Sequence, residues 1–198
     1  MAVSKFSTNS LKTPLKYSSL LAGNAAFVPT SYESIATVSV STAVGSITFS
    51  SIPATHTHLQ LRVITRSAYA GATDNFYYSL NSDTTNANYY SHRLNGDGAS
   101  ATATAANNRI IGSNAVAGNT ATAGVFSSIV IDILDYANTN KYKTSRFLGG
   151  YDNNGSGVIQ FSSSLWSNTA AVTTLGVDFG SGNIAQYSSF ALYGIKGA

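Results

Sequence analysis

The chain has 198 residues, enough to bury one self-sufficient hydrophobic core and too few for a second full domain beside it. Charged residues make up only 10% of the sequence, against the usual ~25%, so we expect a neutral surface rich in hydroxyl and amide groups. The absence of cysteine excludes disulfides, thiolate metal sites and cysteine catalysis.

Residues 1–31 are predicted to form an extended, basic N-terminal arm. They contain Pro14 and Pro29 and keep neither helical nor strand periodicity for long. The net charge of +3 arises there, because basic and acidic residues balance from Glu33 onward. Spaced lysines without arginine form a weak polyanion site, so we expect the arm to dock on protein and not on nucleic acid. The residues expected to contact the partner are Lys5, Lys12, Lys16, Leu20, Leu21 and Phe27.

Residues 32–198 are predicted to form a β-sandwich domain. Tyr, Phe and β-branched residues favour strands, and Gly, Asn and Asp interrupt them. Residues 58–66 alternate clearly, with Leu59, Leu61 and Val63 on one face. The pattern predicts an all-β, two-sheet antiparallel sandwich of jelly-roll type, with an immunoglobulin-like topology as the alternative. The predicted strands are 35–40, 46–52, 58–66, 75–80, 89–94, 125–134, 142–149, 157–163, 172–179 and 187–195.

Two segments between these strands carry their own predictions. Residues 135–141 supply turn residues after an apolar strand, so residues 125–149 form the clearest predicted hairpin. Residues 95–108 contain no bulky apolar side chain, which predicts a long exposed loop, with a short helix as the alternative.

The candidate metal and nucleotide motifs are incomplete, so we expect no metal and no cofactor. His56 and His58 lie two apart and could share one side of a strand, but His92 would have to arrive from elsewhere. The sequence leaves open whether one of these histidines binds a metal on a symmetry axis. Residues 96–101 match G-x-G-x-x-A without the helix that gives it meaning. Residues 152–157 lack the ligand pattern of a calcium loop and predict a hairpin turn.

The sequence also lacks the signatures of common enzymes, and we expect a non-enzymatic protein. There is no G-x-S-x-G elbow, P-loop or H-E-x-x-H motif, and the closest carboxylates, Asp132 and Asp135, belong to one hairpin. Trp166 is predicted to fill the interior. Tyr77, Tyr89 and Tyr90 are candidates for an exposed or intersubunit surface.

No membrane insertion or export by the general secretory route is expected. No apolar run approaches the ~20 residues of a membrane-spanning helix. The N-terminus lacks the apolar region of a signal peptide.

Several segments together resemble a known class of proteins. The segments are KYSSLLAGNAAFVPTS, YESIATVSVS, SITFSSIPATHTHLQLR, IDILDYANTNKYKT, LWSNTAAVTTL and YSSFALYGIKG. They resemble segments of small structural proteins of tailed, notably marine, bacteriophages, over roughly residues 17–197. The resemblance implies a virion, tail-fibre or head-surface protein and no catalytic residues.

The resemblance and the arm together predict a protein on the virion surface, assembled in the bacterial host cytoplasm. As a capsid decoration or cement protein it would bind the major capsid protein through the arm and form a homo-oligomer, expected to be a trimer. As a tail-fibre or spike component it would bind tail proteins and a host surface glycan. The alternative outside phage biology is a free carbohydrate-binding module.

Overall fold

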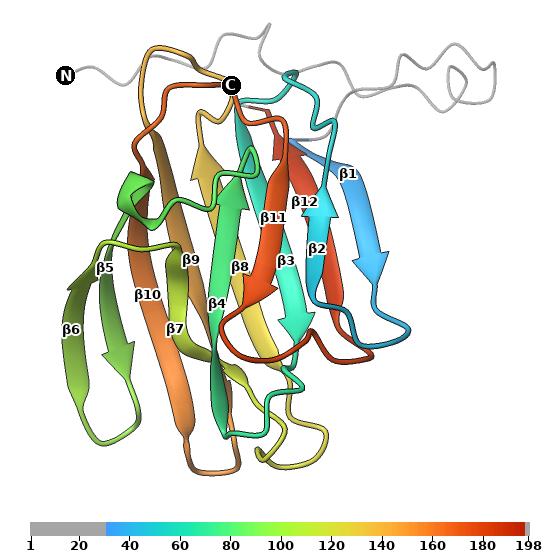
Figure 1. Ribbon diagram of the computed structural model, residues 1–198, viewed down its shortest axis with the longest axis vertical. Coiled ribbons are helices and arrows are strands. Elements are labelled where there is room, and N and C mark those ends of the chain that lie inside the picture. The colour runs from blue at the N-terminus through green and yellow to red at the C-terminus, as the bar shows by residue number, and fades with distance from the viewer. Residues whose placement is uncertain (1–30, 197–198) are drawn as a thin grey trace, which may run out of the picture. The chain divides into compact units, whose positions relative to one another are not determined.

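The computed structural model describes residues 31–196, which form two packed antiparallel β-sheets and one turn of 3-10 helix, η2 (Asn86–Asn88). The larger sheet has the strand order β1 (Tyr32–Ser39), β12 (Ser189–Ile195), β3 (His58–Thr65), β8 (Ser127–Leu134), β9 (Lys143–Asp152), β10 (Gly157–Trp166), β5 (Tyr89–Gly96) and β6 (Ala101–Ala106). The smaller sheet has the order β2 (Ser46–Phe49), β11 (Leu175–Phe179), β4 (Thr73–Leu80) and β7 (Ile110–Ala117), and lies in front in Figure 1.

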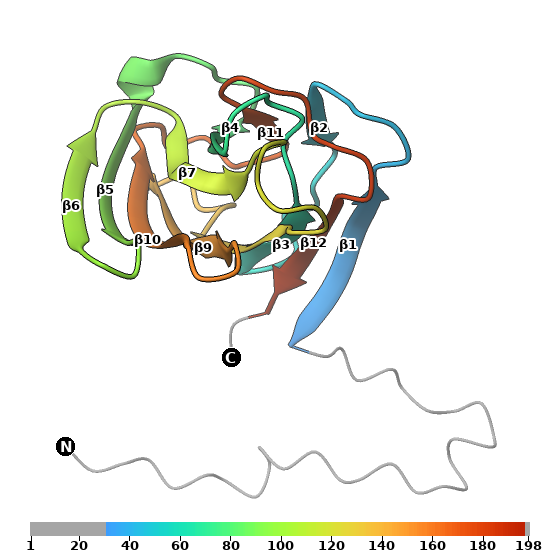
Figure 2. The same ribbon diagram turned by 90° about the horizontal axis from the view of Figure 1, so that it is seen from below.

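The predicted two-sheet antiparallel sandwich is confirmed, because each sheet buries one face against the other. The chain passes between the sheets at most of its connections, as in a jelly roll, and β8, β9 and β10 are consecutive neighbours in one sheet. The predicted 125–149 hairpin is the β8–β9 pair. Figure 2 shows that β5 and β6 extend beyond the edge of the smaller sheet, where β7 is the last strand.

Strand alternation builds the apolar core. In β3 the buried apolar side chains are Leu59, Leu61 and Val63, which lie directly opposite buried isoleucines of β8 such as Ile131. Each fully buried side chain of this size contributes ~1.5–3 kcal/mol relative to leaving it in water. The β3–β8 pair therefore forms the central apolar layer, which the smaller sheet covers.

An aromatic cluster fills one end of the sandwich and includes Trp166, whose predicted interior position is confirmed. Tyr78 meets Tyr89 edge to face at 5.5 Å between ring centroids, and Tyr89 stacks on Trp166 at 6.5 Å. Two of these rings also have polar contacts. The Trp166 indole donates to Asp83 Oδ2 at 2.8 Å, and the Tyr89 hydroxyl donates to the Asp83 carbonyl at 2.9 Å. This combination of stacking and hydrogen bonding fixes the start of β5 against the end of β10.

The prediction of a loop or short helix at residues 95–108 was wrong. This segment contains β6, which pairs with β5 around a turn in which Asp97 Oδ1 accepts from the backbone of Ala99 and Ser100. β6 has the sequence ATATAA because it is an edge strand with exposed side chains, so it needs no bulky apolar residue. β7 was not predicted either. Its small side chains pack under neighbouring strands and give no clear alternation.

Burial of Tyr78 predicts a loss of stability in alkaline solution. Burial raises the pKa of Tyr78 to about 12, and the nearby Ser145 and Ser164 hydroxyls offset only part of this rise. A tyrosine in the unfolded chain ionises near pH ~10. The pKa of Tyr78 is higher in the folded state than in the unfolded state. The contribution of protonated Tyr78 to the free energy of unfolding is therefore complete below pH ~10. It is lost between pH ~10 and 12, at about 1.4 kcal/mol per pH unit.

The Tyr78→Phe variant isolates this effect. Its free energy of unfolding in urea, measured between pH 9 and 11, should fall less steeply with pH than that of the unmodified protein. Within the described residues the Tyr78 hydroxyl forms no hydrogen bond of good geometry. Replacing Tyr78 with Phe therefore breaks no such bond. Equal slopes for the two proteins would contradict the assignment.

Candidate functional site

The outer face of the larger sheet, turned away from the smaller sheet, carries a continuous row of apolar side chains. Val130 of β8 lies opposite Leu148 of β9, Leu148 opposite Phe161 of β10, and Phe161 opposite Leu94 of β5. The next row includes Ile64 of β3 and Ile159 of β10, one pleat further along. We call these six residues the apolar patch: Ile64, Leu94, Val130, Leu148, Ile159 and Phe161.

The apolar patch is solvent-exposed in the single chain. Leu94, Leu148, Ile159 and Phe161 are each between 50% and 58% exposed. Single exposed apolar side chains are ordinary on protein surfaces, but a contiguous set across neighbouring strands marks an interaction surface. The sheet therefore presents an area that water solvates poorly and that another surface can cover.

A groove of about 870 Å³ runs beside this patch and is lined in part by Ile64, Val130, Leu148 and Ile159. Gly150 is one of several glycines in the lining. It has φ +149°, and a Cβ there would lie 1.9 Å from the Val158 carbonyl oxygen, so a side chain at this position clashes with the backbone of β10. Glycine is thus required where β9 passes β10 at this point of the groove.

The charges around the groove are few and mostly paired within the chain. Asp97 and Asp152 lie on its lining, and hydrogen bonds from the backbone of Ser100 and Ala99 hold the pKa of Asp97 below its usual value. On the other side, Arg62 donates to Gln60 Oε1 at 2.8 Å and lies over the Tyr193 ring at 5.2 Å. The lining residues include serines but no histidine, so they contain no serine–histidine pair. The apolar side chains that line the groove favour binding of an apolar segment.

The amphipathic pattern of β10 and β5 is inverted. In β10, Gln160 and Ser162 are fully buried while Ile159 and Phe161 face outward. In β5, Arg93 is buried while Leu94 faces outward. Alternation in a two-sheet sandwich normally turns the apolar face inward. This inversion is the signal that sequence reasoning missed, because the alternation itself does not reveal which face is covered.

The three candidate tyrosines occupy different environments. Tyr90 is exposed on the outer face of β5, as predicted, and lies opposite Leu165. Tyr77 is half-buried and lies under the Arg109 guanidinium at 5.2 Å. The expectation that Tyr89 belongs to an exposed or intersubunit surface was wrong. Its ring is 1% exposed in the aromatic cluster, because side chains alternate and Tyr90 takes the outward position.

The other predicted site residues fall into two groups. The arm residues Lys5, Lys12, Lys16, Leu20, Leu21 and Phe27 lie outside the described residues. The histidines do not come together: His56 contacts Glu33 at 3.3 Å, His58 lies 3.5 Å from Asp135, and His92 is exposed on β5. Across residues 31–196, no group of three or more metal-ligating side chains forms.

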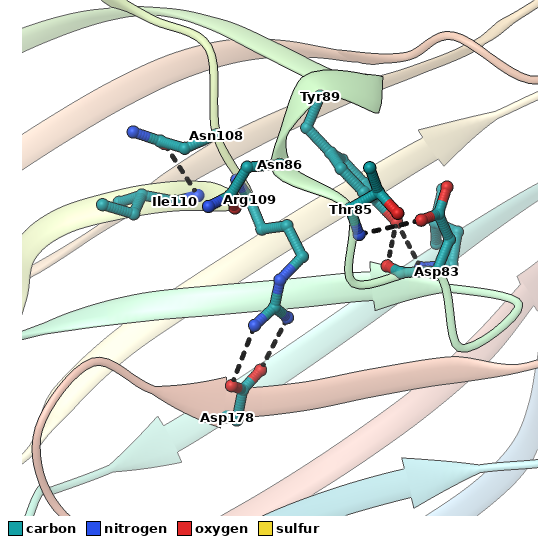
Figure 3. A network of polar contacts seen from close by, with 9 residues as sticks. Asp83, Thr85, Asn86, Tyr89, Asn108, Arg109, Ile110 and Asp178 are labelled. Atoms are coloured by element: carbon teal, nitrogen blue, oxygen red, sulfur yellow. Dashed lines mark hydrogen bonds and ion pairs between the residues drawn. The ribbon is translucent and has the colours of Figure 1, made fainter.

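A polar network near η2, drawn in Figure 3, brings together two carboxylates and an arginine, the residue types that acid–base chemistry uses. Arg109 binds Asp178 through two nitrogens at 3.0 and 3.2 Å. Asp83 accepts from Asn88 and Trp166 at 2.8 Å each, and hydrogen bonds from these side chains contribute to a lowered pKa despite partial burial. Both carboxylates are thus occupied by partners within the chain, and the network ties β5, β7 and β11 together.

No protein-family model matches this chain, and no curated protein matches it. No helix within the described residues is long and apolar enough to cross a membrane.

Proposed function

We propose that this protein is a non-catalytic structural subunit of a tailed-bacteriophage particle, displayed on the particle surface and anchored through its N-terminal arm. Within this class we assign it to the head, as a capsid decoration protein that binds the major capsid protein. The observation that carries the assembly role is the apolar patch, a contiguous exposed surface on a sheet whose opposite face is already covered.

Assembly through this patch explains the inverted pattern in β5 and β10. Leu94, Ile159 and Phe161 contribute little to the core of the single chain, yet they lie side by side in register. Covering them with a neighbouring subunit removes their apolar area from water and provides association energy. A subunit that binds only the assembled shell stabilises that shell by mass action.

The phage assignment is supported by the sequence segments that resemble virion proteins and by the charge-poor composition. The lysines of the arm provide positive charge that an acidic capsid surface would complement. A homotrimer is the proposed state, in keeping with the closed point-group symmetry of most homo-oligomers.

Immunogold electron microscopy of intact virions, with an antibody to residues 32–198, tests this function. We expect label distributed over the heads. Label confined to the tail would replace the decoration role with that of a tail-fibre or spike component. Particles without label would contradict the virion assignment and favour a free carbohydrate-binding module.

Deleting residues 1–30 tests the anchoring role of the arm. Attachment to particles should be lost while the sandwich stays folded, because the deletion keeps the Ser31 carbonyl, which accepts from the Lys196 backbone at 3.0 Å. Circular dichroism of the truncated protein serves as the folding control. A truncated protein that is folded and still decorates particles would show that the arm is not the anchor.

A further inference from the structure

Arg93 of β5 is a buried cation for which the described residues supply no counter-ion. The residue is only 7% exposed, and its Nε and Nη1 atoms are sealed from solvent without a hydrogen-bond partner. It takes part in none of the ion pairs of the described chain. A guanidinium stays protonated at neutral pH, and burying it without acceptors is costly. Lys143, another buried cation, donates to three carbonyl oxygens, whereas the described residues supply no acceptor to Arg93 Nε and Nη1.

The neighbours of Arg93 on the inner face of β10 are further donors. Ser162 lies directly opposite Arg93, and Gln160 lies opposite Asn95, so the four side chains form one patch of adjacent cross-strand pairs. The Ser162 hydroxyl and the Gln160 Nε2 atom are buried and unpartnered, as is Asn95 Oδ1. Donors therefore outnumber acceptors in this patch.

The orientation of Gln160 is fixed by the smaller sheet. Its Oε1 accepts from the Ser113 backbone of β7 at 2.8 Å. Exchanging the amide oxygen and nitrogen would turn two donors toward each other, so Nε2 must remain a donor directed elsewhere. The β7 backbone thus holds one donor of the patch in place.

The surroundings are polar and formed by small side chains. Ser91 and Ser164 form the next cross-strand pair and are buried, and the Ser164 hydroxyl lies near the Tyr78 hydroxyl. Burial lowers the pKa of Arg93, which reflects the poor solvation of its charge. Figure 2 shows β5 beside β10, beyond the edge formed by β7. The group of polar side chains around Arg93 therefore lies near the rim of the sandwich.

We infer that Arg93, Gln160 and Ser162 form a binding site for a small monovalent inorganic anion of the chloride class. The anion accepts from the guanidinium, the amide and the hydroxyl, and neutralises the buried charge of Arg93. Nothing in the proposed virion role requires the site, so the inference stands or fails separately from that role. A bound anion would stabilise the pairing of β5 with β10. The outer faces of these two strands carry part of the apolar patch.

Bromide is a direct probe of this site in the full chain. Crystals grown in sodium bromide should show an anomalous peak within hydrogen-bonding distance of Arg93 Nε or Nη1. In solution, the Tm should rise saturably by about 3–6 °C when bromide replaces gluconate at constant ionic strength, as expected for a ligand that binds only the folded state.

Two variants make the test specific. Arg93→Met should abolish the bromide response, whereas Arg62→Met, which removes an arginine held on the outer face by Gln60, should retain it. If Arg93→Met fails to fold, the anomalous map of the unmodified protein decides. Density that carries no anomalous signal would identify water and overturn the inference. A bromide peak without a saturable Tm change would mean an adventitious ion only and would overturn it as well.

Discussion

Replacing Leu148 with Lys and Phe161 with Asp together should reduce binding of the protein to phage particles by about 100-fold or more. The two side chains lie directly opposite each other at the centre of the apolar patch and are about half exposed. Burying two charged groups in an apolar contact costs several kcal/mol, and each 1.4 kcal/mol corresponds to about a factor of ten in affinity.

The double variant is chosen to leave the isolated fold intact. Opposite charges in a cross-strand pair attract, so the exchanged side chains should not weaken the β9–β10 ladder. The measurement is cosedimentation of purified variant with particles that lack the protein, with the Tm as the folding check.

Tyr142→Asp is the matched control, because Tyr142 is equally exposed, at 51%, but is not part of the patch. It should bind like the unmodified protein. Normal binding by the double variant would show that the outer face is not the contact surface.

Replacing Lys143 with Met should destabilise the fold by about 3 kcal/mol or more. Lys143 is fully buried, and its Nζ atom donates to the carbonyl oxygens of Asn138, Lys141 and Thr169 at 2.6, 3.0 and 2.9 Å. Met fills similar space but leaves three carbonyls without their donor, and each unpaired buried group costs about 1–3 kcal/mol. The loss should appear in the midpoint and extrapolated free energy of urea unfolding.

Lys141→Met provides the comparison. The Lys141 side chain is 54% exposed and pairs with Asp135 at the surface, so its loss should cost about 1 kcal/mol or less. Burial lowers the pKa of Lys143, and the negative charge of Asp135 offsets part of this lowering. Similar losses for the two variants would contradict a special role for the buried lysine in joining the β8–β9 turn to residue 169.

The N-terminal arm is known from the sequence alone. The arm and its lysines were identified from composition and charge, and they lie outside residues 31–196, so their docking role stays a prediction. The apolar patch was not identified in advance. Its members alternate with polar residues in the same way as core residues do, so the strand predicted at residues 157–163 did not show which of its faces is covered.

The sequence by itself determined the fold class and most of the strands, because period-two alternation and glycine-rich turns are local properties. It also indicated the interior position of Trp166. Only the tertiary structure decided which face of β5 and β10 is buried, since that depends on where the smaller sheet ends. β5 and β6 extend past β7, and there the covered face is polar around Arg93 while the apolar side chains of β5 and β10 remain open to a partner.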